Sequence, residues 1–196
     1  MINILFSLLG FLAGSMPFSV WVGRLLLHTD IRAYGDGNPG AANAWRAGGW
    51  RAGLAAGLLD YLKGAIPVGL AHFRFGVTGP ALIVVALAPV LGHAFSPFLR
   101  FRGGKAVAVT FGIWTGLTLG EIPILFGALL GVFYFVLAAD SWSVMLGMIG
   151  VLAYLLLREH PPLLVTVWIG NTLVLAWKHR ADLGQKPRLR PWLRRP

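Results

Sequence analysis

Hydrophobic residues along this 196-residue chain fall into seven stretches, which short polar or turn-forming segments separate. The stretches cover approximately residues 3–27, 52–73, 78–99, 106–120, 122–139, 142–157 and 161–177. Several of them are shorter than the about 20 apolar residues that a membrane-crossing helix usually needs. The pattern nevertheless predicts an all-α protein, built as a polytopic bundle of membrane helices.

The composition supports a membrane protein. Hydrophobic residues make up 57% of the chain and charged residues only 12%, which is too little polar material to cover a soluble globule. The first stretch, over residues 1–27, lacks a basic start and a small-residue cleavage site, so we interpret it as a retained first span. Cysteine is absent and the histidines are scattered, so we expect no metal centre, and no motif calls for a cofactor.

The net charge of +10 comes from basic residues that flank the apolar stretches and do not form a soluble patch with interleaved aromatic residues. We therefore expect contact with anionic membrane lipids and no binding of nucleic acid. Lys and Arg gather in the first loop, in the loop near residue 100 and in the tail from residue 178 onward. By the positive-inside rule, these three segments share the cytoplasmic side.

The basic segments also limit the number of helices between them. An even number must separate the second segment from the third, and polar interruptions divide that region into four parts at Glu121, Asp140 and Arg158. We therefore predict seven transmembrane helices, with the N-terminus outside and the C-terminus cytoplasmic. They form one domain over residues 1–183, followed by a basic, disordered tail over residues 184–196. Five spans are the alternative, with an acidic residue buried in a re-entrant pair, which is costly.

A glycine- and asparagine-rich loop lies between the first two stretches. It reads Gly-Asp-Gly-Asn-Pro-Gly-Ala-Ala-Asn-Ala-Trp-Arg over residues 35–46. Glycines free the backbone to turn several N–H groups toward one point, and Arg46 adds a fork of charged donors suited to phosphate. The loop predicts an anion-binding site at a membrane surface, with a plain turn between helices as the alternative. Ser15 and Pro17 precede it as packing or kink residues, or as binding residues.

A second polar segment, Phe-Arg-Gly-Gly-Lys at residues 101–105, precedes the fourth stretch. Free N–H groups, the positive end of a helix and the ammonium of Lys105 come together there and predict a phosphate cradle. The segment is not a nucleotide P-loop, because the required glycine spacing and the following Ser or Thr are missing. The alternative is a flexible turn with a positive-inside flank, and His93 is interpreted as a capping or packing residue.

A third polar group surrounds the last stretch, with Asn171 inside it and a basic segment at its end. His179 in that segment is suited to hydrogen-bond an oxyanion or to exchange a proton near neutral pH. Lys178 and Arg180 beside it have an ordinary explanation as flanking charges.

An ionisable pair lies within the second stretch. Asp60 and Lys63 are three residues apart and therefore face the same side of a helix, where they neutralise one another. Charged groups at that depth indicate a functional site. The alternative is a structural pair that ties helices together.

In their order and spacing, these motifs resemble one known family, the integral-membrane acyl-phosphate:glycerol-3-phosphate acyltransferases of bacterial phospholipid synthesis. The resemblance spans nearly the full length and rests on Gly14-Ser15 with Pro17, the loop 35–46, Asp60-Tyr61-Leu62-Lys63-Gly64, Leu91-Gly92-His93, residues 101–105 and Lys178-His179-Arg180. It implies a seven-span protein of the bacterial plasma membrane with a cytoplasmic active site. It also implies transfer of an acyl group from acyl phosphate to the 1-hydroxyl of glycerol 3-phosphate, giving lysophosphatidate without coenzyme A or acyl carrier protein.

The chain departs from the family pattern at several of these positions. Asp36 stands where the family usually has Ser, and Asp182 where it usually has Asn. Other departures are Ala42 for Thr, Ala106 for Gly, Val109 for Thr and the missing glutamate shortly after residue 182. A carboxylate that faces a dianion is repulsive unless it turns away, pairs with Arg46 or Lys105, or is protonated.

The resemblance implies a site that surrounds two phosphates, those of the acyl donor and of glycerol 3-phosphate. The candidate catalytic residues are Lys105, His179, Arg46 and Asp36. The candidate substrate-binding residues are Gly37, Asn38, Gly40, Asn43, Gly103, Gly104, Lys63 and Asp182. The proton acceptor is the donor's own phosphate, His179 or Asp36. Expected partners are the two substrates, membrane lipids and the enzyme that forms acyl phosphate.

Two other functions are compatible with the residues. A transporter of a phosphorylated solute would use the same basic sites, but the sequence has no inverted repeat with paired broken helices. A divergent paralogue would bind lipid or acyl phosphate without the acyltransferase activity, and Asp36 with the altered third motif is its best support.

Overall fold

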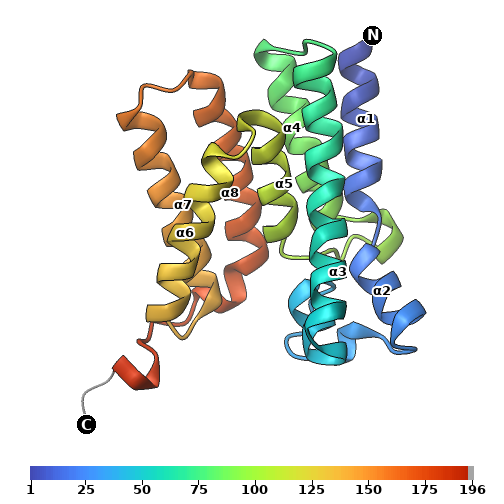
Figure 1. The fold of residues 1–196 in the computed structure, drawn as a ribbon, viewed down its shortest axis with the longest axis vertical. Helices are drawn as coiled ribbons and strands as arrows, with labels where there is room; N and C mark the ends of the chain where they lie inside the picture. Colours follow the sequence, from blue (N-terminus) through green and yellow to red (C-terminus); the bar gives the residue numbers. More distant parts are fainter. Residues whose placement is uncertain (194–196) are drawn as a thin grey trace.

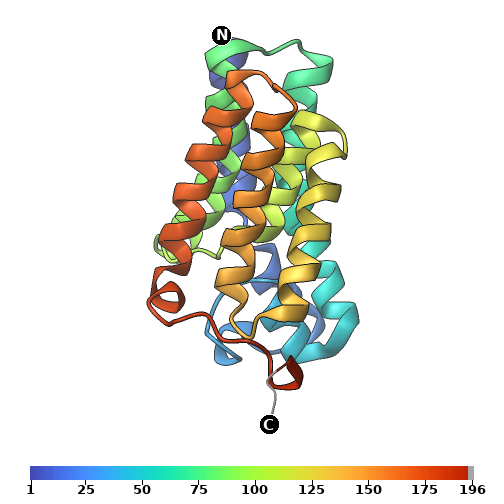
Figure 2. The same ribbon diagram turned by 90° about the vertical axis from the view of Figure 1, so that its left-hand side faces the viewer.

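A computed structural model describes residues 1–193 of the chain as a bundle of helices that run roughly alongside one another (Figures 1 and 2). The α-helices are α1 (Ile2–Ser15), α2 (Phe18–Leu26), α3 (Ala41–Gly69), α4 (Gly79–Ala94), α5 (Val107–Thr118), α6 (Glu121–Val136), α7 (Asp140–Leu157) and α8 (Pro162–Leu183). Short helical turns are η1 (Ile31–Ala33), η2 (Leu70–Arg74), η3 (Pro97–Leu99) and η4 (Pro191–Leu193). The prediction of an all-α fold is confirmed, because each predicted apolar stretch of the described chain is largely helical.

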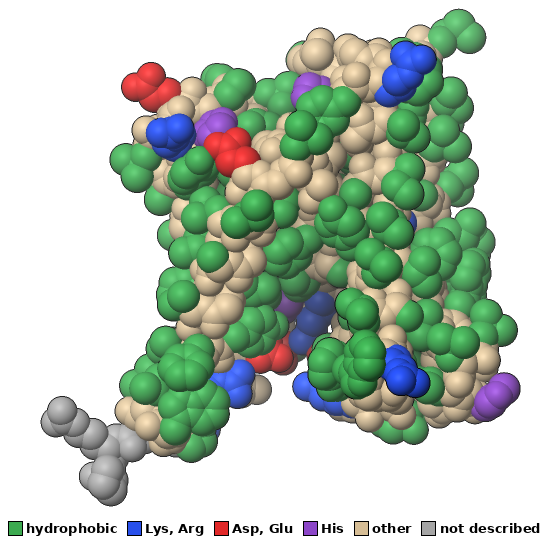
Figure 3. All heavy atoms as spheres, in the orientation of Figure 1, with side chains coloured by type: hydrophobic (Ala, Val, Ile, Leu, Met, Phe, Trp, Pro, Cys, Tyr) green, Lys and Arg blue, Asp and Glu red, His purple; other side chains and the backbone are tan. Residues whose placement is uncertain are grey.

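Within residues 1–193, four helical segments are long and apolar enough to cross a membrane. They are Ile2–Leu26, Ala41–Arg74, Gly79–Leu99 and Asp140–Leu157. The apolar helices α5 and α6 are shorter, with 12 and 16 residues. At 1.5 Å per residue, α5 is only about 18 Å long, less than the about 30 Å hydrocarbon core of a bilayer. Hydrophobic side chains cover much of the outer face of the bundle, as lipid contact requires (Figure 3).

The first apolar stretch is broken, although the sequence analysis treats it as one span. Helix α1 ends at Ser15 and α2 begins at Phe18, because Pro17 between them has no N–H to continue the helix. Lys63 of α3 donates to the freed carbonyl of Met16 at 2.9 Å. The break therefore stays satisfied inside an apolar environment.

The predicted neutralising pair of Asp60 and Lys63 is confirmed, with 2.7 Å between the Lys63 Nζ and Asp60 Oδ1 atoms. Both side chains are buried, and the Asp60 carboxylate also accepts a hydrogen bond from Ser19 Oγ on α2. With the Lys63 bond to Met16, the pair ties α3 to both sides of the α1–α2 break. The contacts match the structural alternative stated for this pair.

Helix α3 changes direction near its start. Gly48 and Gly49 have non-helical backbone angles, and the φ of +72° at Gly49 is one that L side chains rarely adopt. A short helical segment over residues 41–47 therefore precedes the long apolar part of α3. This short segment carries Asn43 and Arg46 from the first loop motif.

Glycines allow α3 and α5 to approach closely. Gly112 and Gly116 of α5 are four residues apart and face α3, where a Cβ on Gly112 would overlap with the Tyr61 carbonyl oxygen. A Cβ on Gly116 would crowd Gly69 and Val68. Small residues at this spacing permit close backbone contact between membrane helices. The result is a tightly packed pair at the centre of the bundle.

A buried polar network links α5 to α8. Asn171 Oδ1 accepts from Trp114 Nε1 at 3.1 Å, and Asn171 Nδ2 donates to Thr110 Oγ1 at 2.9 Å. From the sequence, Asn171 is expected to belong with the polar residues around the end of the last stretch. In the structure, Asn171 is fully buried in the middle of α8 and joins helices.

We expect Asn171→Ala to destabilise the fold by about 1–3 kcal/mol, because the substitution leaves Trp114 and Thr110 without their buried partner. Thermal unfolding in detergent, followed by tryptophan fluorescence, measures the loss. Thr172→Ala is the matched control, because the Thr172 hydroxyl has no hydrogen-bond partner among the described residues. Equal unfolding temperatures for the two variants would contradict the prediction.

The tail, expected to be disordered, makes backbone contacts in its described part. Arg188 and Arg190 exchange backbone hydrogen bonds with Ala138 and Val136 at the end of α6. Arg190 Nε also donates to the carbonyls of Tyr134 and Leu137. Residues 184–193 therefore lie against the α6–α7 connection, and residues 194–196 of the predicted tail lie outside the described part of the chain.

Candidate active site

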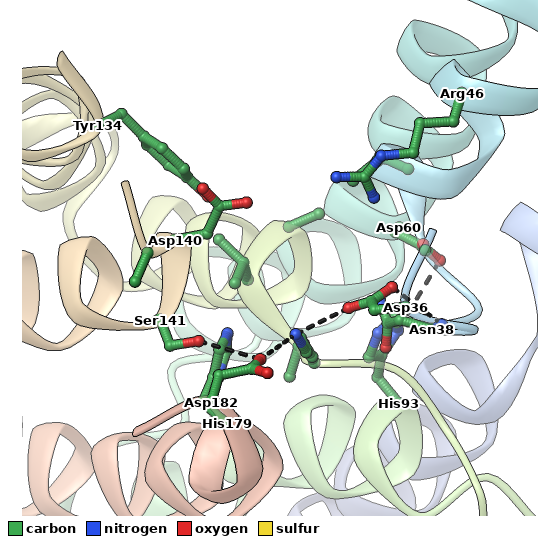
Figure 4. Close-up of a pocket in the computed structure, with 18 of the residues that line it drawn as sticks. Asp36, Asn38, Arg46, Asp60, His93, Tyr134, Asp140, Ser141, His179 and Asp182 are labelled. Atoms are coloured by element: carbon green, nitrogen blue, oxygen red, sulfur yellow. Dashed lines mark hydrogen bonds and ion pairs between the residues drawn. The ribbon is translucent and has the colours of Figure 1, made fainter. Parts of the chain in front are cut away.

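A cavity of about 570 Å³ opens between α3, α5, α8 and the start of α7. Figure 3 shows a hollow in this part of the molecule, with basic, acidic and histidine side chains inside it. The charged or polar lining side chains are Asp36, Asn38, Arg46, Asp60, His93, Lys105, Tyr134, Asp140, Ser141, His179, Asp182 and Gln185. Segments far apart in the sequence thus supply one polar site in a mostly apolar protein (Figure 4).

The first loop lines part of the cavity, and the hydrogen bonds within this loop meet at Asp36. Asp36 Oδ1 accepts from the Asn38 N–H at 3.1 Å and from Asn43 Nδ2 at 2.9 Å. The first of these bonds closes a side-chain turn that Asp forms readily. Asn43 in turn accepts from Arg46 Nη1 at 2.7 Å through its Oδ1. The loop is therefore organised around a carboxylate and presents an arginine beside it.

Lys105 lies between two carboxylates. Its Nζ is 2.8 Å from Asp36 Oδ2 and 2.6 Å from Asp182 Oδ2. Asp182 also accepts from Ser141 Oγ at 3.1 Å. Asp36 thus takes one of the arrangements that the sequence analysis allows for it, pairing with Lys105.

The ion pair keeps both Asp36 and Lys105 charged. Burial raises the pKa of Asp36, but hydrogen bonds from Lys105, Asn38 and Asn43 outweigh it and lower that pKa to about 2. Burial lowers the pKa of Lys105, but Asp182 and Asp36 outweigh it and raise that pKa above its ordinary value. The cavity therefore presents a lysine ammonium and an aspartate carboxylate throughout the neutral range.

We expect the ionisation of Asp36 not to appear in the pH dependence of catalysis. Its pKa is depressed relative to the unfolded value of about 3.9, so its contribution to stability is present above that pH and lost as the pH falls toward 2. Between about pH 5 and pH 9 it does not titrate. Profiles of kcat/KM against pH for wild type and Asp36→Asn should have the same shape. Loss of an acid limb in the variant would contradict this.

Hydrogen bonds fix the backbone of Gly103 and Gly104, which precede Lys105. The Gly104 N–H donates to the His93 carbonyl at 3.1 Å, and a Cβ on Gly103 would overlap with the same oxygen. Lys178 Nζ donates to the carbonyls of Gly103 at 2.7 Å and of Ala94 at 3.0 Å. The interpretation of Lys178 as a flanking charge is therefore wrong, because its ammonium turns inward and bridges α4, α8 and the glycine loop.

We expect Lys178→Met to lower kcat/KM about 10- to 100-fold, because the loop that places Lys105 loses its bridge. Lys178→Arg should restore part of the activity, since a guanidinium also donates to two carbonyls. Arg180→Met is the matched control on the same helix. Arg180 is exposed and donates to the Trp177 carbonyl. Steady-state kinetics in lipid measures all three, and equal losses in Lys178→Met and Arg180→Met would contradict the positioning role.

His179 faces the cavity in a defined protonation pattern. Its Nδ1 lies 2.8 Å from the Leu175 carbonyl oxygen, which can only accept, so Nδ1 carries a hydrogen. In the neutral ring, Nε2 is then free of hydrogen and able to accept one. The buried His179 side chain therefore offers a proton acceptor at the floor of the cavity.

An apolar cavity of about 740 Å³ adjoins the polar one and shares Arg46 and Asp140 with it. Its apolar walls come mainly from α3 and α5 and include Trp45, Leu54, Leu58 and Phe111. The first three of these side chains are more than half exposed on the outer surface of the bundle. The site is thus continuous with the lipid-facing side of the protein.

The structure brings together all four candidate catalytic residues and three candidate substrate-binding residues, Asn38, Gly40 and Asp182. Asn43 supports the loop without lining the cavity, and Gly103 and Gly104 lie behind Lys105 against His93. Gly37 lines a separate cavity, and Lys63 is directed to Met16.

The sequence analysis does not select Tyr134, Asp140 or Ser141, which lie along one side of the cavity in Figure 4. The predicted topology contains a signal for Asp140 and Ser141, since it places their loop on the same side as the three basic segments. Among the described residues, no group of three or more His, Cys, Asp or Glu side chains is arranged to hold a metal ion.

Comparisons with known proteins identify the family to which the chain is similar. A family model described as glycerol-3-phosphate acyltransferase matches residues 4–186. Glycerol-3-phosphate acyltransferase 1 of Thermotoga maritima is 36% identical, with 93% of this chain and 97% of that protein covered. Glycerol-3-phosphate acyltransferase of Listeria monocytogenes is 35% identical, with 97% and 98% covered.

Two solved structures have the same fold. Both are crystal structures of PlsY (YgiH), an integral membrane glycerol 3-phosphate acyltransferase. Its glycerol 3-phosphate form superposes with a TM-score of 0.84 at 28% identity, and its lysophosphatidic acid form with 0.83 at 27%. Each comparison covers 93% of this chain and 90% of the other. The family match over nearly the whole length, together with the shared fold, shows that this chain belongs to the glycerol-3-phosphate acyltransferase family.

Proposed function

We propose that this protein transfers an acyl group from acyl phosphate to the 1-hydroxyl of glycerol 3-phosphate, forming lysophosphatidate and phosphate. The observation that carries the proposal is the junction of the two cavities. A polar cavity with Lys105 and Arg46 suits phosphate groups, and the adjoining apolar cavity opens on the lipid-facing surface. A soluble phosphate ester and a lipid-soluble acyl phosphate would meet at that junction.

In the proposed reaction, the glycerol hydroxyl oxygen attacks the acyl carbonyl carbon, and the bond from that carbon to the phosphate oxygen breaks. The hydroxyl proton passes to the departing phosphate or to His179 Nε2. Lys105 and Arg46 stabilise the negative charge on the two phosphates and on the attacked carbonyl. A mixed anhydride is already activated, so holding the two substrates in line supplies much of the rate.

The proposed topology is seven transmembrane helices, with the N-terminus outside and the active site facing the cytoplasm. The α1–α2 pair forms the first span, and α3 to α8 form the other six. The charge distribution supports this arrangement, because all three basic segments then lie on one side. The short α5 and α6 cross only part of the bilayer thickness as helices, and the loop before α5 supplies Lys105 within the bundle.

The test is lysophosphatidate formation by the purified protein in lipid, supplied with palmitoyl phosphate and glycerol 3-phosphate. We expect product and inorganic phosphate in equal amounts, and no product when palmitoyl coenzyme A replaces the acyl phosphate. Release of phosphate without acceptor transfer would identify a hydrolase. Well-folded protein that makes no product would overturn the proposal and favour the divergent paralogue that only binds lipid or acyl phosphate.

A further inference from the structure

A third cavity, of about 830 Å³, lies on the other side of the loop that carries Asp36. Four arginines line it and come from three parts of the chain. They are Arg24 of α2, Arg32 of η1, and Arg100 and Arg102 of the segment after η3. Trp21 and Phe98 line the same cavity and are 40% and 55% exposed. None of these six side chains belongs to the candidate active site.

The charge in this third cavity is only partly neutralised. Asp30 Oδ2 lies 2.6 Å from Arg32 Nη2 and 3.6 Å from Arg24 Nη2, so two guanidiniums share one carboxylate. Within the described part of the chain, the Arg100 and Arg102 side chains have no hydrogen bond or ion pair, and both are exposed. The cavity therefore has a surplus of positive charge that an anion would neutralise.

The backbone that carries these two free arginines is strained. Arg100 and Phe101 adopt φ values of +52° and +61°, and this left-handed conformation costs about 1–2 kcal/mol at each residue other than glycine. Strained backbone of this kind is found at binding sites, where the surrounding structure supports it. Here it turns the chain sharply between η3 and Gly103 and leaves both guanidiniums beside the cavity.

We propose that the third cavity, called the lipid cavity below, binds the phosphate headgroup of an anionic phospholipid from the surrounding bilayer. Guanidiniums match phosphate oxygens in a planar fork, and they are more weakly hydrated than lysine ammonium groups. Exposed tryptophan and phenylalanine beside the charges are the side chains that sit at the level of lipid headgroups. A headgroup bound there leaves its acyl chains against the apolar surface of α2, where Leu25 and Leu26 are exposed.

One loop separates the lipid cavity from the candidate active site. Asp36, Asn38 and Gly40 line the active site, whereas Gly37 and Pro39 line the lipid cavity. A headgroup in the lipid cavity therefore contacts the reverse side of the loop that orients Asp36 toward Lys105. We infer that the bound lipid orders this loop and lowers the KM for the phosphate substrate, an effect that rests on the proposed function.

Lipid retention tests the site without any assay of activity. Native mass spectrometry of the detergent-solubilised protein, titrated with phosphatidylglycerol, is expected to show one tightly held lipid on wild type. The variant Arg100→Gln/Arg102→Gln should bind it about tenfold more weakly, because two charges near the headgroup are removed. The control Arg74→Gln/Arg158→Gln removes two charges from loops at the opposite end of the bundle and should bind as wild type does (Figure 1). Equal weakening in both variants would overturn the site.

Two further arms identify the ligand and the coupling. Inorganic phosphate should not displace the lipid at comparable concentration; displacement would assign the cavity to soluble phosphate and overturn the lipid proposal. In nanodiscs, added phosphatidylglycerol should lower the KM of wild type for glycerol 3-phosphate about threefold or more, but not that of Arg100→Gln/Arg102→Gln. An identical lipid response in both proteins would overturn the coupling. The binding arm decides the site even if the protein proves to have a different activity.

Discussion

Replacing Lys105 with alanine is expected to lower kcat/KM about 10³-fold, the largest effect of any single substitution considered in this protein. Lys105 is the cation at the centre of the polar cavity, with Asp36 and Asp182 within 2.8 Å of its Nζ. Its removal leaves two carboxylates facing each other and no ammonium for the phosphate. The measurement is steady-state acyl transfer in lipid, with the unfolding temperature of the variant recorded beside it.

Lys186→Ala is a matched control for Lys105→Ala, because Lys186 is an exposed lysine in the tail. It should retain wild-type activity. Normal turnover by well-folded Lys105→Ala protein would show that Lys105 only pairs with the two aspartates and takes no part in the reaction.

The double substitution Asp36→Ser/Asp182→Asn is expected to lower the KM for glycerol 3-phosphate, by about 10- to 100-fold. Both carboxylates lie next to the ammonium that would hold a phosphate, and two negative charges at that distance cost a dianion on the order of 1–4 kcal/mol in total. Ser and Asn keep hydrogen-bonding groups at the two positions. Initial rates over a range of glycerol 3-phosphate concentrations measure the change.

The control for this double substitution must remove a carboxylate that lies away from the cavity, which excludes Asp140 because it lines the cavity. Glu159 is exposed in the connection between α7 and α8, so the KM of Glu159→Gln should equal that of wild type. A higher KM in the Asp36→Ser/Asp182→Asn protein would show that the carboxylates themselves accept hydrogen bonds from the substrate hydroxyls.

The bundle of helices was predictable from the sequence because burial in lipid demands long apolar segments, and those are visible as stretches. That polar residues of three separate motifs would mark a site was also predictable, since glycine, asparagine and basic residues are conspicuous between such segments, and the structure brings residues of all three to one cavity. The break at Pro17 was harder to predict, because proline is tolerated inside membrane helices when a neighbour satisfies the freed carbonyl. Here the freed carbonyl is that of Met16, and the neighbour is Lys63, 47 residues after Met16 in the chain.

Side-chain direction could not be predicted from local sequence. Lys178 follows an apolar helix, where a flanking charge normally reaches the headgroups, but the carbonyls of Gly103 and Ala94 offer it a nearer partner. Those carbonyls are brought to α8 only by the tertiary fold. The sequence allows Asp36 to pair with Lys105 but does not select this arrangement over the others, because the choice needs the loops at residues 36 and 105 to meet.

One departure from the family pattern has a clear structural cost. Ala106, where the family usually has glycine, adopts a φ of +65° immediately before α5. Glycine populates this region freely, whereas alanine is strained there. This chain therefore places Lys105 beside a residue whose conformation the surrounding packing must enforce.

The apolar cavity opens on the lipid-facing surface beside Trp45, Leu54 and Leu58, and this opening determines which concentration of the donor governs the proposed reaction. For a lipid-soluble donor that enters from the membrane plane, the effective concentration is the amount per unit of membrane area and not the amount per volume of buffer. Diluting the donor with inert phospholipid should therefore slow the reaction even when its amount per millilitre is unchanged. Under the proposed reaction and topology, the product enters the leaflet on which the cavity opens, so turnover adds lipid to one side of the bilayer.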